Sequence, residues 1–216
     1  MTTIAEQSAA LSTASAEHLP AEVRAAFAAD LAALVAAGVP AGVLPAGTPF
    51  PDGALLDAHG AQTSLAATRA GRPAVVVLYR GDWCPYCNLA LRTYQQELLP
   101  ALAARGVALI AISPQKPDGA LSMQEKNDLA FAVLSDPGNQ IGAGLGVLTQ
   151  ASDDARAAQE KLGVVVADGN ADGTATLPMP TVAVVDPAGL IRWIDVHPDY
   201  NTRSEVADIL AAVSAL

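Results

Sequence analysis

Cys84 and Cys87 are the only cysteines among the 216 residues, and two residues, Pro85 and Tyr86, separate them. They follow the apolar run 74–79, which is typical of a strand buried on both faces, and they open a segment with helical leucine spacing. A thiol at the start of a helix faces unpaired backbone N–H groups, which stabilise its thiolate. The spacing puts both sulfurs on one helical turn. It therefore predicts a redox pair in which Cys84 is the exposed nucleophile and Cys87 the resolving thiol.

A Cys-x-x-Cys pair can also serve purposes that involve no redox chemistry. Such a pair can be half of a zinc site, but zinc needs four ligands, and His18, His59 and His197 are scattered along the chain. Two buried thiols can also pack as small apolar side chains without chemistry. We expect no metal and no organic cofactor. Arg80 is a candidate source of positive potential for the thiols, although a loop arginine is more often simply solvated.

Composition narrows the class of protein. The chain is 51% hydrophobic and long enough for one domain with a sizeable core and an extension. Its net charge of −10 has the wrong sign for a nucleic-acid or anionic-membrane surface. No run of 18 apolar residues occurs, and the first residues lack the basic and apolar regions of a signal peptide. We expect a soluble, cytoplasmic protein.

The elements that must position the cysteines alternate between helices and strands. Pro20 and the apolar stripe from Val23 to Leu34 predict a helix that ends near Gly38, and the Gly and Pro density of residues 38–50 predicts a linker. The stripe can pack on its own domain or form a homodimer contact. Further predicted elements are a hairpin near 52–60, strands at 74–79, 106–112 and 131–134, a helix from the cysteines with a kink at Pro100, a helix at 118–130, short helices near 139–144 and 151–161, a hairpin of 181–185 with 191–196, and a terminal helix. This order predicts an α/β sandwich around a central mixed sheet.

The segment from Tyr79 to Asn88, with Trp83 before the first cysteine, resembles the active-site loop of thioredoxin-fold proteins. In its longer context it is similar to the peroxiredoxin-like branch of the AhpC/TSA superfamily (alkyl hydroperoxide reductase and thiol-specific antioxidant). The resemblance runs from about Gly47 to Tyr200 and leaves residues 1–46 outside, as a helical extension and linker to a redox domain at 47–216. It also includes the segments 111–115, 134–138 and 184–189.

The resemblance implies a thioredoxin-like fold and places further residues at the site. Trp83 and Pro85 support the cysteines. Met179 and Pro180 precede the penultimate strand, where the family resemblance implies a cis proline that faces the thiols. Peroxide-reducing relatives also carry a proline and a threonine before the reactive cysteine, but Val77 and Gly81 stand at those positions.

Two further positions depart from the families that the loop resembles. Met179 replaces an arginine expected of peroxidases, and Leu78 replaces the buried acid of thioredoxins. The resemblance therefore implies a thiol-dependent oxidoreductase that reduces peroxides or disulfides and is re-reduced by thioredoxin or a low-molecular-weight thiol. The alternatives are a disulfide oxidoreductase without significant peroxidase activity and a non-catalytic redox-sensing protein.

Overall fold

The central element is a seven-stranded mixed sheet whose buried strands carry continuous apolar runs. The structure, a computed structural model, describes residues 2–216. The strand order is β2-β1-β5-β4-β3-β8-β9. β3 (Ala74–Leu78), β4 (Ala108–Ser113) and β5 (Ala132–Ser135) are parallel, and β8 (Thr181–Val185) pairs antiparallel with both β3 and β9 (Ile191–Val196). The hairpin of β1 (Leu55–Leu56) and β2 (Gln62–Thr63) forms the other edge. The predicted α/β architecture with a central mixed sheet is confirmed.

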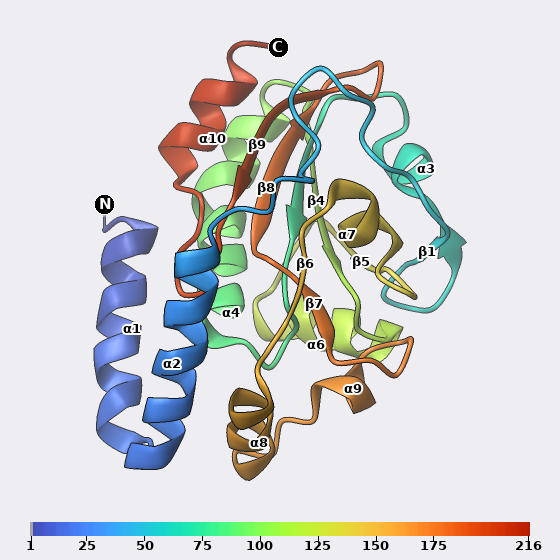
Figure 1. Ribbon diagram of the computed structural model, residues 1–216. Helices are drawn as coiled ribbons and strands as arrows, with labels where there is room; N and C mark the ends of the chain where they lie inside the picture. Colours follow the sequence, from blue (N-terminus) through green and yellow to red (C-terminus); the bar gives the residue numbers. More distant parts are fainter. Residues whose placement is uncertain (1) are drawn as a thin grey trace.

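Helices cover both faces of this sheet (Figure 1). Alternate residues of β3 pack into two hydrophobic cores, one on each face of the sheet. Val75 and Val77 pack with α4 (Pro85–Thr93), α6 (Pro117–Lys126) and α10 (Val206–Val213). Ala74 and Val76 pack with α3 (Leu65–Arg69) and α7 (Gln140–Leu145) on the opposite face. Because β3 is buried on both sides, its end is a rigid base for the loop that carries the cysteines.

The helix that begins at the cysteines is distorted one turn before the predicted kink. After α4 the chain makes a π-helical turn, Tyr94–Leu98, and then continues as α5 (Leu99–Ala103). Pro100 explains the position of this turn, since a proline ring inside a helix clashes with the carbonyl four residues earlier, here that of Gln96.

Residues 2–37 form two antiparallel helices that stand beside the sheet domain (Figure 1). α1 (Ile4–His18) packs against α4, and α2 (Ala21–Ala37) packs against α8 (Asp153–Lys161). Glu205, the N-cap residue of α10, accepts hydrogen bonds from the N–H groups of Ile4 and Ala5 at 3.0 and 2.8 Å. One carboxylate thus joins the start of α1 to the segment that precedes the last helix.

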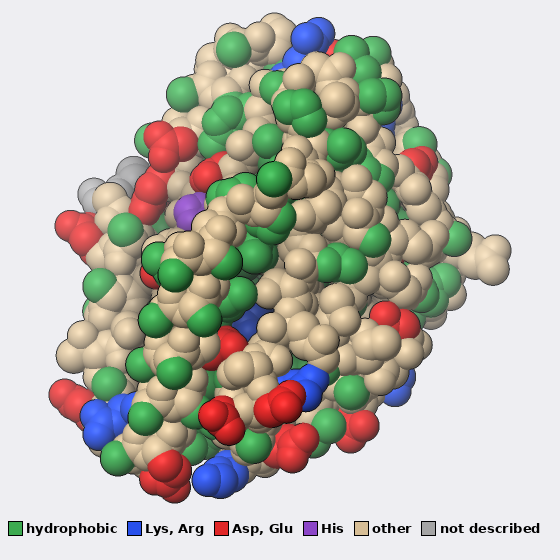
Figure 2. Space-filling view, viewed as in Figure 1, with side chains coloured by type: hydrophobic (Ala, Val, Ile, Leu, Met, Phe, Trp, Pro, Cys, Tyr) green, Lys and Arg blue, Asp and Glu red, His purple; other side chains and the backbone are tan. Residues whose placement is uncertain are grey.

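The remaining elements lie between β5 and β8. A two-stranded sheet of β6 (Leu148–Gln150) and β7 (Thr176–Pro178) is accompanied by α8 and the short α9 (Val166–Gly169). Acidic and basic side chains both lie on this lower end of the molecule, near α8, whereas hydrophobic side chains follow α2 (Figure 2). Within residues 2–216, no helix combines the length and the apolar character needed to cross a bilayer.

Candidate functional site

Both cysteines lie where β3 gives way to α4. Cys84 is the N-cap residue of α4, Pro85 occupies the first turn, and the Cys87 N–H donates to the Cys84 carbonyl at 3.1 Å. Both are free thiols. The predicted position at a helix start is therefore observed, but the predicted exposure of Cys84 is wrong, since the residue is only 2% exposed. The side chain belongs to the core cluster that includes residues of β3 and α4, a burial that the local sequence does not reveal.

An arginine far away in the sequence contacts both sulfurs. Arg203 Nη2 donates to Cys87 Sγ at 3.0 Å and lies 3.8 Å from Cys84 Sγ. Its Nη1 donates to the carbonyls of Tyr200 and Thr202 at 2.7 and 2.6 Å, so the loop before α10 holds the guanidinium in place. The side chain is buried. Arg203 could not be found from the sequence, because it lies in no recognisable motif and more than a hundred residues from the thiols.

The two thiols share a negative charge unequally. The Cys84 thiol donates to the Cys87 sulfur, and this hydrogen bond, together with burial, raises the pKa of Cys84 well above its usual range. Burial raises the pKa of Cys87 too, but the hydrogen bond from Cys84 and the nearby Arg203 charge outweigh it, so the pKa of Cys87 lies well below its usual range. The helix start predicts a thiolate at Cys84, whereas the hydrogen bond between the thiols and the shorter distance to Arg203 favour the negative charge on Cys87.

Arg80 is not the solvated loop arginine that the sequence favoured. It is buried, and its guanidinium carbon lies 5.1 Å from the ring centre of Trp83 and 4.3 Å from that of Tyr200. Stacking between two aromatic rings keeps this cation desolvated, and its charge adds to that of Arg203 in lowering the pKa of Cys87. Gly81 makes the stack possible, since a Cβ there would overlap the Trp83 indole.

A polar network fixes the loop between β3 and α4. The Asp82 N–H donates to Gln115 Oε1, and Gln115 Nε2 donates to the Asp82 carboxylate, each at 2.7 Å. Ser122 and Lys126 donate to the other carboxylate oxygen at 2.8 and 3.0 Å. Asn88 Nδ2 donates to the carbonyls of Asp82 and Cys84. The loop is thus bound to α6 as well as to its own helix.

Met179 and Pro180 precede β8 beside the end of β3 but do not form the predicted cis bond. The bond between them is trans, so the predicted cis proline is wrong. The Met179 N–H donates to the Val147 carbonyl at 2.8 Å, and the Pro180 carbonyl accepts from the His197 N–H at 2.9 Å. These bonds keep the chain extended and paired from β7 into β8, with the peptide bond in the common trans form. Both residues line a small cavity that also contacts Arg80 and Tyr200, whereas Cys84 lines a different and larger one.

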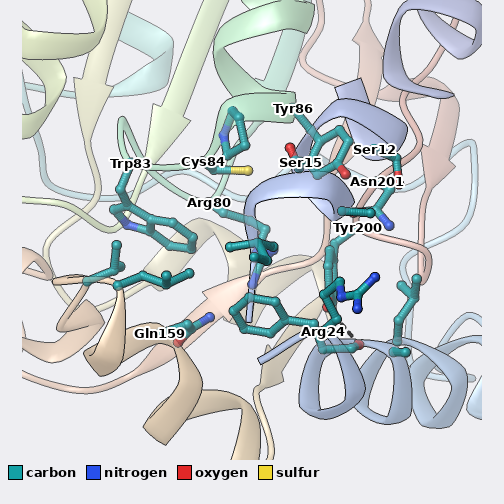
Figure 3. Close-up of a pocket in the computed structure, with 18 of the residues that line it drawn as sticks. Ser12, Ser15, Arg24, Arg80, Trp83, Cys84, Tyr86, Gln159, Tyr200 and Asn201 are labelled. Carbon is teal, nitrogen blue, oxygen red and sulfur yellow. Dashed lines mark hydrogen bonds between the residues drawn. The ribbon is translucent and has the colours of Figure 1, made fainter. Parts of the chain in front are cut away.

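The larger cavity has a volume of about 630 Å³ and is lined by Cys84 but not by Cys87. Trp83, Pro85 and Tyr86 contribute from the cysteine loop. Arg80 and Tyr200 line it as well, while the remaining walls come from α1, α2 and the end of α8 (Figure 3). Of the two cysteines, Cys84 is therefore the one that borders the cavity. No group of three or more metal-ligating His, Cys, Asp or Glu side chains occurs within residues 2–216.

Comparison with known proteins gives the family. The sequence model of the AhpC/TSA family matches residues 46–194. A protein of Mycobacterium tuberculosis (strain H37Rv), named "Putative peroxiredoxin", is 32% identical over 87 residues, which are 40% of this chain and 54% of the relative. The chain thus matches about half the length of this curated relative.

Solved peroxiredoxin structures share the fold. The peroxidoxin BcpB of Mycobacterium tuberculosis superimposes with a TM-score of 0.60 and 18% identity, over 80% of this chain and 98% of the other. Reduced Prx3 of Vibrio vulnificus, solved in complex with H₂O₂, gives a TM-score of 0.63 and 18% identity, over 79% and 99%. The expected thioredoxin-like fold is confirmed. With a family match over more than half of its length, the chain belongs to the AhpC/TSA family.

Proposed function

We propose that this protein is a thiol-dependent peroxidase that cycles Cys84 and Cys87 between dithiol and disulfide. The observation that carries the proposal is the contact of Arg203 with both sulfurs, at the wall of a cavity that only Cys84 reaches. In this proposal residues 47–216 are the redox domain and residues 1–46 are an addition to it. Trp83, Pro85 and Arg80 support the thiols, whereas Met179 and Pro180 do not take part.

The first step uses the proton shared by the thiols. Transfer of the Cys84 proton to the Cys87 thiolate, along the hydrogen bond between them, leaves Cys84 as the nucleophile. Its sulfur attacks the terminal oxygen of a hydroperoxide, ROOH. The O–O bond breaks with its electron pair on the leaving RO oxygen, which takes a proton from water and departs as ROH. Cys84 is thereby oxidised to a sulfenic acid.

The second step closes the disulfide. The Cys87 sulfur attacks the Cys84 sulfur, and the hydroxyl leaves with the Cys87 proton as water. Arg203 contacts both reacting sulfurs and Arg80 lines the cavity, so two buried cations can stabilise the negative charge that develops on the leaving oxygen. In this proposal Arg203 and Arg80 take the roles of the threonine and the arginine of peroxide-reducing relatives, because this chain has Gly81 and Met179 at those two positions.

Two electrons from outside the protein must complete the cycle. We propose that thioredoxin or a low-molecular-weight thiol reduces the disulfide and is itself oxidised to one, in the cytoplasm, where such thiols are kept reduced. The net charge of the chain gives no reason to include a nucleic acid or a membrane among the partners.

The test compares hydroperoxide consumption by the wild type, Cys84→Ser and Cys87→Ser, in the presence of dithiothreitol. The wild type should turn over, Cys84→Ser should lose activity, and Cys87→Ser should form a sulfenic acid, which mass spectrometry of a dimedone adduct detects. Full activity in Cys84→Ser would overturn the assignment of the nucleophile. Rapid reduction of insulin disulfides with no consumption of any hydroperoxide would overturn the peroxidase and leave a disulfide oxidoreductase.

A further inference from the structure

The segment between β9 and α10 carries a cluster of hydrogen-bonded side chains that the proposed mechanism does not use. Asp195 lies near the end of β9, and His197 is the first residue after that strand. Thr202 and Ser204 are the two neighbours of Arg203 in the chain. β9 pairs with β8 from Ile191 to Val196 and is therefore a rigid base. The cluster joins this strand to the two residues that flank the arginine of the thiol site.

Asp195 holds the residue that follows Arg203. Its Oδ2 accepts hydrogen bonds from Ser204 Oγ at 2.7 Å and from His197 Nε2 at 3.0 Å. The hydrogen bond from His197, together with that from Ser204, lowers the pKa of Asp195 against the opposing effect of burial, so the carboxylate is charged at neutral pH. The Ser204 carbonyl accepts from the Tyr94 hydroxyl at 2.7 Å. Ser204 is thus fixed both from β9 and from the helix that begins at the cysteines.

His197 holds the residue that precedes Arg203. Its Nδ1 lies 2.7 Å from Thr202 Oγ1, and this hydroxyl also donates to the Asp199 carbonyl at 2.8 Å. A threonine hydroxyl has a single proton, so when the carbonyl accepts that proton, Nδ1 must be the donor to Thr202. Nε2 must donate too, because the Asp195 carboxylate only accepts. All these bonds are therefore satisfied together when both nitrogens carry a proton and His197 forms an ion pair with Asp195.

Arg203 needs this support because its anchors belong to its own loop. Nη1 donates to the carbonyls of Tyr200 and Thr202, and Nη2 contacts the sulfurs. A shift of the loop therefore carries the guanidinium with it. At an effective dielectric constant of about 20, a retreat of about 1 Å from Cys87 weakens the attraction enough to change the acid dissociation constant about tenfold.

We propose that Asp195 is a positioning residue of the thiol site: together with His197 and Ser204 it holds the loop that keeps the Arg203 charge beside Cys87. This inference rests on the proposed function, since it takes the thiol pair as the reacting group. It adds a residue that acts on the pair through the arginine.

The sign of the effect distinguishes positioning from direct electrostatics. A carboxylate close to a thiol raises the pKa of that thiol by its charge, so its removal alone would lower the pKa. Removal of a residue that holds Arg203 has the opposite result, because the cation retreats and the pKa of the thiol pair rises.

The experiment is a pH titration of the thiolate ultraviolet absorbance in Asp195→Asn and Ser204→Ala. Asp195→Asn keeps the size of the side chain and removes its charge. We expect the acid dissociation constant of the thiol pair to decrease about tenfold in Asp195→Asn and about threefold in Ser204→Ala, which loses one of the two bonds that Asp195 accepts. An unchanged or increased dissociation constant in Asp195→Asn, with a circular dichroism spectrum like that of the wild type, would overturn the proposal.

Asp186→Asn is the matched control. Asp186 lies at the other end of the same hairpin, where its carboxylate accepts from Arg192 Nε at 2.8 Å and from the Leu190 N–H at 2.9 Å. Its loss should lower the thermal unfolding temperature, as Asp195→Asn does, and leave the thiol titration unchanged. An equal shift of the titration in Asp186→Asn and Asp195→Asn would show that loosening of the hairpin moves the pKa, and would refute positioning by Asp195.

A double-mutant cycle tests the route through Arg203. In the Arg203→Met background no guanidinium remains to be held, so Asp195→Asn should no longer raise the pKa of the thiol pair. A rise of the same size in both backgrounds would overturn the proposal. The titration requires no turnover, so failure of the wild type to consume hydroperoxides would count against the proposed function alone.

Discussion

Replacing Arg203 with methionine should remove most of the thiolate at neutral pH. The guanidinium nitrogen lies 3.0 Å from one sulfur and 3.8 Å from the other. At an effective dielectric constant of about 20, a unit charge at these distances contributes about 4 to 6 kcal/mol. If water that enters the vacated space cancels half of that energy, roughly 2 to 3 kcal/mol remains, which corresponds to about a 100-fold decrease in the acid dissociation constant of the thiol pair.

The assay is a pH titration of the thiolate ultraviolet absorbance, together with the rate of iodoacetamide alkylation. Arg203 lowers the pKa of the thiol pair, so its loss raises that pKa: the thiolate signal at pH 7 should fall, and the variant should approach the wild type only in strongly alkaline solution. Arg203→Lys keeps the positive charge but loses the hydrogen bonds that Nη1 donates to the Tyr200 and Thr202 carbonyls. Its thiolate signal at pH 7 should therefore lie between those of Arg203→Met and the wild type. Circular dichroism and thermal unfolding serve as controls for folding.

Two results would refute this reasoning. If the titration of Arg203→Met coincided with that of the wild type, the arginine would have no electrostatic effect on the thiols. If alkylation were slowed by the same factor at every pH, including where both proteins are fully ionised, Arg203 would act by shaping the site and not by its charge.

Three further predictions concern the elements that position the thiols. Tyr94→Phe removes the hydroxyl that donates to the buried Ser204 carbonyl at 2.7 Å, and we expect the free energy of unfolding in urea to fall by about 1 to 3 kcal/mol; an unchanged urea midpoint would contradict this. For Asp82, burial raises the pKa, but the hydrogen bonds from its partners outweigh burial and lower it. Its stabilising contribution should therefore be present at pH 7 and be lost as the pH falls below about 4, so Asp82→Asn should be less stable than the wild type at pH 7 and approach it in acid; a gap that does not narrow would argue against the carboxylate. Gly81→Ala places a methyl group against the Trp83 indole and should lower kcat/KM for every hydroperoxide, whereas normal kinetics would show that the aromatic stack is not needed.

The sheet could be predicted from the sequence because its signals are local. Residues 74–79 and 106–112 are continuous apolar runs, and the turn at Asp186 to Gly189 joins two strands, so β3, β4 and the β8–β9 hairpin followed directly. The first 37 residues were harder to delimit. Alanine is tolerated on either face of a helix, so α1 shows little apolar periodicity.

The cysteine pair was found from its spacing, but its surroundings were not. Arg203 comes from a loop more than a hundred residues away, and nothing in its neighbours marks it as a contact of a thiol. The same holds for the burial of Arg80, which depends on stacking against the ring of Tyr200, a residue far away in the sequence. The cis proline was expected from a family resemblance alone. In the structure the Met179 N–H pairs with the Val147 carbonyl and the bond before Pro180 is trans.

The bond between Glu205 and the start of α1 has a thermodynamic consequence. Glu205 binds the first N–H groups of a helix that lines the cavity, and it lies two residues after the arginine that contacts the thiols. A ligand that displaced α1 would therefore act, through one carboxylate, on the loop that holds Arg203 beside Cys87. Linkage makes such a coupling reciprocal: a ligand that changes the proton affinity of Cys87 has its own affinity changed by the same factor when Cys87 is protonated. The affinity of the cavity for the product alcohol would then depend on whether Cys87 carries a proton.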